Sequence, residues 1–208
     1  HAIVYADEIS NRNLRPYITY PQGNFASPVF HGERPDPMPH YEMTGNPVSI
    51  AFSEQSPPVK MRSFKLYQDT KEIRDVKILD KDNDPNRLLT ERQFALFPLQ
   101  PLEYDTDYRA VFEYRQNGKD RTAEWTFSTQ KPDYPYFIVK GGETLAIESG
   151  QKYFIHWQDF WCLKQCERYN YRMNRDTQLD IIERQAGGII IRVNGSKGSS
   201  IRLMPEGE

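Results

Sequence analysis

The stretch PLQPLEYDTDYRAVFEYRQNGKDRTAEWTFST, from Pro98 to Thr129, indicates the fold more directly than any other part of the chain. Apolar and polar side chains alternate before the dipeptide Asn117-Gly118, and they alternate again, with the same period of two residues, after it. The apolar positions are Tyr108, Ala110, Phe112 and Tyr114, then Ala123, Trp125 and Phe127. A period of two is typical of half-buried antiparallel strands, and Asn-Gly supplies the positive φ angles of a type I′ turn. The stretch therefore predicts the last hairpin of a β-sandwich, a class that more often binds or spaces than catalyses.

Upstream of this hairpin, short apolar segments with turn signals between them predict the remaining strands of the sandwich. The phase of the alternation slips near Arg62-Ser63, which predicts a β-bulge there. The predicted strands are Tyr17–Tyr20, Val48–Phe52, Val59–Tyr67, Ile73–Leu79 and Phe94–Phe97, the last being short and apolar as a central strand would be.

Composition divides the chain into three regions. Residues 1–47 form a lead-in and a proline-rich segment, in which four prolines from Pro28 to Pro39 forbid a helix and hold the chain extended against the first domain. Residues 48–131, with the first strand at 17–20, form an Ig-like β-sandwich. Residues 132–208 form a small β-domain after the Lys131–Pro135 linker.

The third region predicts a small antiparallel β-barrel or sandwich, so the whole chain is predicted to be all-β. Its glycine pairs and Ser149-Gly150 mark turns between short apolar segments. The predicted strands are Tyr136–Val139, Thr144–Ile147, Tyr153–Gln158, Tyr169–Met173, Leu179–Gln185, Ile189–Val193 and Ile201–Met204.

Bulk composition excludes several classes of protein. The 208 residues are 38% hydrophobic, 27% charged and 13% aromatic, and the aromatic content argues against disorder. The net charge of -2 and the lack of a basic block argue against a nucleic-acid partner. No apolar run reaches the ~20 residues of a membrane-spanning helix. The chain begins with His1 rather than Met, and we expect it to be a piece of a longer protein.

The two cysteines, Cys162 and Cys166, lie four positions apart. A disulfide across a short loop would fit an exported protein, whereas two free thiols on one helical turn explain the same spacing. Zinc would need two further ligands, and His156 is the one histidine in this half of the chain. We favour the disulfide.

Several segments, in this order, resemble a known module. They are GERPDPMP, GNPVSIAF, FALFPLQPL, YDTDYRAVF and WTFST, within residues 16–129. They are similar to the Ig-like or fibronectin-like module that follows the CAP domain (cysteine-rich secretory, antigen and pathogenesis-related superfamily) in bacterial secreted proteins. The resemblance implies an exported bacterial protein with a CAP domain before His1. The CAP domain's own acidic and histidine residues have no counterpart here, and residues 132–208 fall outside the resemblance.

One acidic loop has the spacing of a calcium site. Asp80, Asp82, Asp84 and Glu91 occupy positions 1, 3, 5 and 12 of an EF-hand-like loop. Position 6, where glycine makes the sharp turn, is Pro85, and the flanking segments are predicted strands. A solvated acidic turn without any ion explains the same residues, so no cofactor is predicted and calcium is kept as the alternative.

Other ionisable residues do not match a catalytic motif. His31 and His40 lie in the proline-rich segment with Glu33 and Asp36, and extended chain would point these side chains in different directions. His156, between Ile155 and Trp157, is interpreted as a packed histidine. The sequence contains no GxSxG nucleophile motif and no phosphate-binding glycine loop.

Aromatic residues supply the candidate ligand-binding site. Phe160 and Trp161, beside the cysteines, and Trp157, in the preceding strand, would stack on a sugar ring or anchor a protein partner if exposed. The alternative is that the strand residues form the core of a small domain. A second candidate surface is the face of the proline-rich segment.

These observations predict a non-catalytic pair of accessory β-domains of an exported protein, located in the periplasm, at the cell surface or in the medium. They would position or attach a partner domain and bind a protein or polysaccharide at the cell surface. A carbohydrate-binding module and an enzyme of unrecognised type are the alternatives.

Overall fold

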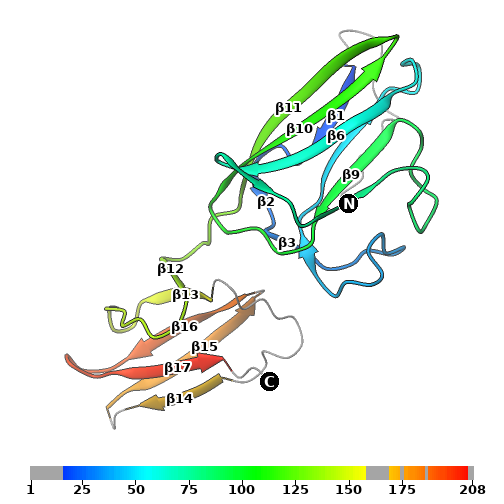
Figure 1. Cartoon of the computed structure of the whole chain (residues 1–208). Coiled ribbons are helices and arrows are strands. Elements are labelled where there is room, and N and C mark those ends of the chain that lie inside the picture. Colours follow the sequence, from blue (N-terminus) through cyan, green and yellow to red (C-terminus); the bar gives the residue numbers. More distant parts are fainter. Residues whose placement is uncertain (1–15, 158–168, 174–175, 186, 206–208) are drawn as a thin grey trace. The chain divides into compact units, whose positions relative to one another are not determined.

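The computed structural model describes residues 16–157, 169–173, 176–185 and 187–205. The chain divides into two compact units, His1–Lys131 and Pro132–Glu208. The described residues form β-strands and no helix, and none of their sheets closes on itself, so the predicted all-β sandwich fold is confirmed (Figure 1). The described part of the chain has no helix of the length and apolarity needed to cross a membrane.

The first unit contains a four-stranded and a five-stranded sheet. The four-stranded sheet has the order β1 (Tyr17–Tyr20), β5 (Val48–Phe52), β9 (Gln93–Pro98), β8 (Val76–Leu79). The five-stranded sheet has the order β2 (Gly23–Ala26), β11 (Lys119–Thr129), β10 (Asp107–Gln116), β6 (Lys60–Gln68), β7 (Lys71–Ile73). A short pair, β3 (Val29–Phe30) and β4 (Thr44–Gly45), lies outside both sheets. With β1, β5, β9 and β8 as strands A, B, E and D, and β11, β10, β6 and β7 as G, F, C and C′, this is the strand order of an Ig-like sandwich.

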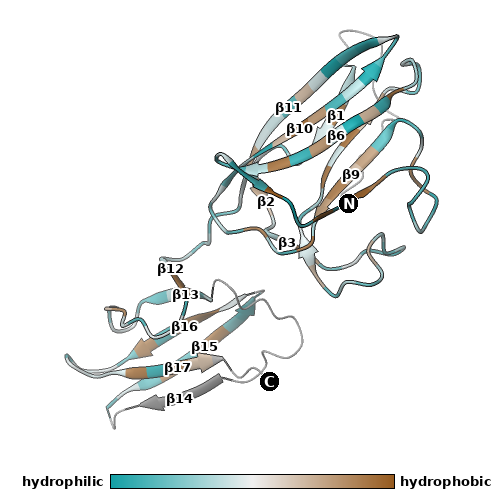
Figure 2. Ribbon diagram, viewed as in Figure 1, coloured by the Kyte–Doolittle hydropathy of each residue, from teal (hydrophilic) through white to brown (hydrophobic). Residues whose placement is uncertain are grey.

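Alternating side chains build the core between these two sheets. Val48, Ile50 and Phe52 of β5 face it from one sheet, and Ala110 and Phe112 of β10 face it from the other; all five are at most 3% exposed. Figure 2 shows the same alternation as changes of colour along the strands. The buried positions of the hairpin are those that its period of two predicts.

The turns of the first unit also follow from sequence. Asn117 and Gly118 have φ angles of 51° and 71°, as a two-residue type I′ turn requires. The register of β6 against β10 shifts between Glu113 and Tyr114, where Arg62 is left without a partner, so the predicted bulge is confirmed. At the start of β10, the buried Tyr108 hydroxyl accepts a hydrogen bond from the Glu103 N–H at 2.9 Å, the tyrosine corner of Ig-like sandwiches.

The prediction of one strand from Ile73 to Leu79 was wrong. The chain leaves the five-stranded sheet after Ile73 and joins the four-stranded sheet at Val76, and a backbone bond from the Val76 N–H to the Arg74 carbonyl closes the corner. Apolar and polar residues keep alternating in the sequence through this crossing. The change of sheet is therefore visible only in which strands pair by hydrogen bonds.

The second unit contains a four-stranded sheet and a strand pair. The sheet has the order β12 (Tyr136–Val139), β13 (Lys152–Trp157), β16 (Gly188–Asn194), β15 (Gln178–Gln185). The pair is β14 (Tyr169–Met173) with β17 (Ile201–Pro205). Ile201 and Leu203 of β17 pack on the core that Tyr153, Ile155 and Ile191 form. The sheets are open, which makes this unit a small sandwich rather than a barrel.

Two details of the second unit differ from the expectation. β12 pairs in parallel with β13, so the sheet is mixed rather than purely antiparallel. The predicted strand at Thr144–Ile147 is not formed, although Leu145 and Ile147 pack against the core. The turn before it is organised by Glu143, whose carboxylate accepts hydrogen bonds from the N–H groups of Lys140 and Gly141; these bonds lower the pKa of Glu143.

Candidate functional site

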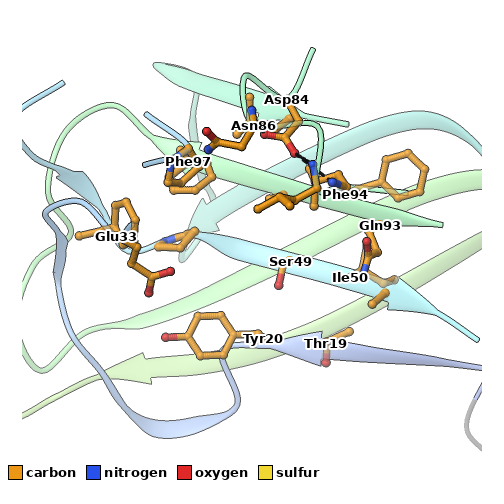
Figure 3. Close-up of a pocket in the computed structure, with 18 of the residues that line it drawn as sticks. Thr19, Tyr20, Glu33, Ser49, Ile50, Asp84, Asn86, Gln93, Phe94 and Phe97 are labelled. Carbon is orange, nitrogen blue, oxygen red and sulfur yellow. Dashed lines mark hydrogen bonds between the residues drawn. The ribbon is translucent and has the colours of Figure 1, made fainter. Parts of the chain in front are cut away.

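A row of side chains across the outer face of the four-stranded sheet forms the floor of a pocket. Tyr20 pairs with Ser49, Ser49 with Ala95, and Ala95 with Leu79, so these four positions lie side by side on the four strands. The central strands β5 and β9 carry the small residues of this row, and the outer strands carry the large ones. With Ala51 of β5, Ser49 and Ala95 leave a depression between the larger side chains (Figure 3).

The proline-rich segment, Pro28–Pro39, covers one end of this outer face. Phe30 packs edge-on against Phe97 of β9, with ring centroids 5.4 Å apart, and Met38 is 1% exposed in the same cluster. Pro35 and Pro37 line the pocket from this side. The predicted extended segment against the first domain is therefore a wall of the pocket, because its apolar residues bury the outward apolar residues of the sheet.

The loop of residues 80–92 forms a second wall, and Asp84 organises it. One Asp84 oxygen accepts a hydrogen bond from the Asn86 N–H at 3.0 Å; the other accepts from the Leu88 and Leu89 N–H groups at 2.7 and 2.9 Å. These bonds fold the turn that presents Leu88 and Leu89 to the pocket. Burial of the Asp84 carboxylate disfavours its charge, but the three backbone bonds outweigh it and lower the pKa of Asp84 below its ordinary value.

A hydrogen bond joins the two walls. The side-chain Nδ2 of Asn86 donates to the backbone carbonyl of Asp36 at 2.8 Å, and the Asp36 carboxylate in turn accepts from the Met38 N–H at 2.8 Å. The 80–92 loop and the proline-rich segment are distant in the sequence, and this contact fixes one against the other. The two walls are therefore joined by this polar contact as well as by the apolar cluster that contains Met38 and Leu89.

The pocket is small and mostly apolar. Its volume is about 70 Å³. Glu33 lies at its edge on the proline-rich segment, near Tyr20 and Ser49, and Gln93 lies at the other end (Figure 3). The Tyr20 hydroxyl approaches the Asn46 side-chain oxygen at 3.5 Å. Such a site can enclose an apolar group and offer polar groups at its mouth.

The four acidic residues of the alternative calcium site are not grouped as ligands of one ion. The Asp80 carboxylate accepts from the N–H groups of Asp82 and Asn83, and Glu91 pairs with Arg92 at 2.6 Å. Asp84 is occupied as described above. In the described ranges, no three histidine, cysteine, aspartate or glutamate side chains are grouped to hold a metal ion, and this includes His31, His40, Glu33 and Asp36.

The predicted aromatic site is described in part. Phe160, Trp161, Cys162 and Cys166 lie outside the described residues. Trp157 is 9% exposed and belongs to the core of the second unit, so of the two alternatives given for this strand residue the core is the one observed.

His156 is a packed side chain, as interpreted from the sequence. It is fully buried, its Nδ1 lies 3.0 Å from the Gly187 carbonyl, and its ring stacks on Phe154 at 6.2 Å between centroids.

Sequence reasoning assigned the proline-rich face as a binding surface but missed the floor of the pocket. The signal was present in VSIAF, residues 48–52, where the residues between the core positions are serine and alanine rather than charged. Ala95 repeats it in FAL, residues 94–96. Small outward residues on central strands indicate that another part of the molecule, or a ligand, approaches the sheet closely.

Comparison with known proteins identifies no family for this chain. No family model and no curated protein matches it. Among solved structures, it is similar to titin domains I67–I69 in an E-to-A mutated variant, with 9% identity and a TM-score of 0.27 over 92% of this chain and 65% of that one. It is also similar to the titin Ig tandem A164–A165, with 11% identity and a TM-score of 0.23 over 76% of this chain and 85% of that one. The chain spans slightly less than two thirds of the I67–I69 structure.

Proposed function

We propose that this chain is a non-catalytic pair of β-domains of an exported bacterial protein, and that it positions or attaches a partner domain. The resemblance of residues 16–129 to the module that follows CAP domains supports an upstream CAP domain as that partner. The Ig-like strand order supports an accessory role, because such sandwiches serve widely as spacer and binding modules.

The apolar pocket of the first unit is the observation that carries the proposal. Its walls are held by hydrogen bonds that the Asp84 carboxylate accepts and the Asn86 side chain donates, so these two side chains are committed to structure. An apolar recess with a rigid wall serves binding, whereas acid–base catalysis needs an ionisable group whose pKa is moved toward neutrality. The pKa of Asp84 is moved the other way, which keeps it ionised.

The experiment that tests the proposal is fractionation of the producing organism, with detection by antibodies against this chain. The native protein is purified without reductant, and its intact mass is measured beside thiol labelling. We expect an exported species heavier than the 24.5 kDa of this chain, with a CAP domain in the added mass. A cytoplasmic species of 24.5 kDa would overturn the proposal.

A further inference from the structure

We propose that a second cleft of the first unit, at the side of the sandwich, binds a neutral sugar ring of a polysaccharide. This side cleft shares only Thr19 with the apolar pocket on the outer face of the four-stranded sheet. The inference goes beyond the proposed function and does not depend on it. It draws on how the two sheets end at this side, on a buried donor without an acceptor, and on the charge of the lining.

The side cleft lies where the two sheets are open at one edge. β1 is the edge strand of the four-stranded sheet, and the chain crosses from it to β2 in the other sheet. β2 pairs with β11 only from Phe127 to Thr129, so the preceding residues of β11 are not covered by it. Residues of β1, of the crossing and of this part of β11 enclose about 430 Å³. Pockets for small molecules measure about 300–1,000 Å³, so the side cleft has room for such a ligand.

Trp125 gives the side cleft a hydrogen-bond donor that is not used. Its ring packs against Phe64 of the core, with centroids 5.9 Å apart. Its indole Nε1 is buried, and no described residue accepts a hydrogen bond from it. Buried indole N–H groups usually have an acceptor, so we infer that the occupant of the side cleft carries oxygen acceptors. A purely apolar ligand would leave this donor without a partner.

The other polar side chains of the side cleft suit hydroxyl groups. The Gln22 Nε2 donates to the Thr19 carbonyl at 3.0 Å and to the Thr19 hydroxyl oxygen at 3.1 Å. These bonds hold the carboxamide in place, so its Oε1 remains as an acceptor and the Thr19 hydroxyl remains as a donor. Tyr17 and Trp125 add aromatic surface. A sugar ring combines apolar C–H faces with hydroxyl groups that both donate and accept, and it therefore matches this lining.

The charge of the side cleft selects a neutral ligand. Among the described residues that line it, none is lysine, arginine or histidine, and Glu124 is the one carboxylate. The charge of Glu124 is already paired with Arg109 at 3.4 Å, so it does not select a cation. An anionic sugar would meet this carboxylate without a compensating cation.

The edge of β11 opposes a peptide as the occupant. A peptide in this position would add to the sheet as a strand beside β11. Lys119, Asp120 and Arg121 follow one another on this strand and are exposed, and charged residues on a sheet edge oppose the addition of a strand. A sugar ring needs no such pairing, which favours a polysaccharide over a peptide.

The test is an NMR titration of the full chain with three neutral trisaccharides: cellotriose, maltotriose and chitotriose. We expect at least one of them to shift the indole N–H signal of Trp125 and the amide signals of Thr19, Gln22 and Thr126. The affinity should be weak, with a Kd of about 0.1–10 mM, because one ring makes few contacts. The signal that is missing in Trp125→Phe identifies the Trp125 indole.

Two variants of the protein localise the effect. Trp125→Phe keeps an aromatic ring and removes the donor, and it should weaken binding about fivefold, whereas Trp157→Phe, in the core of the second unit, is the matched control. Gln22→Ala removes an exposed carboxamide and should weaken binding about threefold, with Gln55→Ala as its exposed control. The second pair keeps the test decisive if Trp125→Phe does not fold.

Three outcomes would overturn the inference. The first is no shift from any of the three saccharides at concentrations of about 10 mM and above. The second is an equal shift of the same signals by the blocked peptide acetyl-Ala-Ala-Ala-amide, which would indicate a peptide site. The third is unchanged affinity in both Trp125→Phe and Gln22→Ala, which would place sugar binding elsewhere on the chain.

Discussion

The two outer faces of the first sandwich are built by the same alternation and have opposite characters. On β5 and β9, the residues between core positions are small or apolar, as Ser49, Ala51 and Ala95 are, and the proline-rich segment and the 80–92 loop flank them. On β10 and β11, several of the corresponding residues are charged, and Arg109 and Glu124 form an ion pair at 3.4 Å. The side chains that point inward from each strand form the core of the sandwich. The side chains that point outward determine whether the outer face of the sheet is solvated or is covered by another segment.

On the outer face of the five-stranded sheet, called the polar face below, exposed polar side chains contact one another. Arg109 also lies over the Tyr67 ring at 4.7 Å, and the Ser63 hydroxyl donates to the Glu113 carboxylate at 2.6 Å. Figure 2 shows hydrophilic colours on the part of β11 that follows the hairpin turn. These side chains hold one another while they stay exposed, so removing one leaves no cavity.

The largest expected effect on stability is from Phe97→Ala, on the outer face of the four-stranded sheet that the proline-rich segment covers. Phe97 is 4% exposed and packs against Phe30, and truncation leaves a cavity between the sheet and the proline-rich segment. We expect a loss of about 3–5 kcal/mol in the free energy of unfolding. Urea denaturation measures it, and a loss below about 1 kcal/mol would mean that the segment does not pack there in solution.

A smaller effect is expected from Asp84→Asn, which weakens the three backbone bonds of the pocket wall. We expect a loss of about 1–3 kcal/mol near neutral pH. Because the pKa of Asp84 is lowered on folding, its ionised form stabilises the protein above the unfolded value of 3.8. That contribution is lost as pH falls through the lower folded pKa, so the variant and the wild type should converge in acid.

The control for this prediction is Asp82→Asn, in the same loop but with an exposed side chain. Denaturation midpoints measured from neutral pH down to acid should separate Asp84→Asn from the wild type and leave Asp82→Asn close to it. Curves that run parallel at all pH values would show that the Asp84 charge has no structural role.

Arg109→Ala tests the polar face and should cost less. Arg109 is 39% exposed at its side chain, and it loses one ion pair and one contact with an aromatic ring. We expect a loss of about 0.5–1 kcal/mol, decreasing with added salt. A loss above about 2 kcal/mol would contradict the interpretation that the polar side chains of this outer face are solvated and contribute little to stability.

The smallest expected effect is the coupling between Arg109 and Glu124. A double-mutant cycle with Arg109→Ala and Glu124→Ala should give a coupling energy of about 0.2–0.5 kcal/mol, because both side chains are exposed. A larger value would mean that the polar face is partly desolvated and resembles the covered face more than its exposure suggests.

Much of the first unit could be predicted because its signals are local. The period of two placed Phe112 and Ala110 in the core, and Asn117-Gly118 placed the hairpin turn, since both depend on neighbouring residues. The crossing between Ile73 and Val76 could not be predicted in this way, because alternation is the same whichever sheet accepts the strand.

The candidate site was harder to predict than the fold. Asp84 was noted for its spacing in an acidic loop, but its role is to accept three backbone N–H groups, which depends on how the loop turns. Trp157 was a candidate for ligand binding as well as for the core, and the structure places it in the core of the second unit. A list of residue types near one another does not contain the direction in which each side chain points.

The sequence by itself determined that this protein is all-β, with an Ig-like sandwich whose last hairpin turns at Asn117-Gly118. Alternation and turn chemistry act over a few residues, and they are therefore encoded where they occur. Only the tertiary structure decided that Ser49, Ala95 and Leu79 lie in one row under the proline-rich segment. Strand pairing joins residues that are distant in the chain, and a pocket exists only where such distant residues meet.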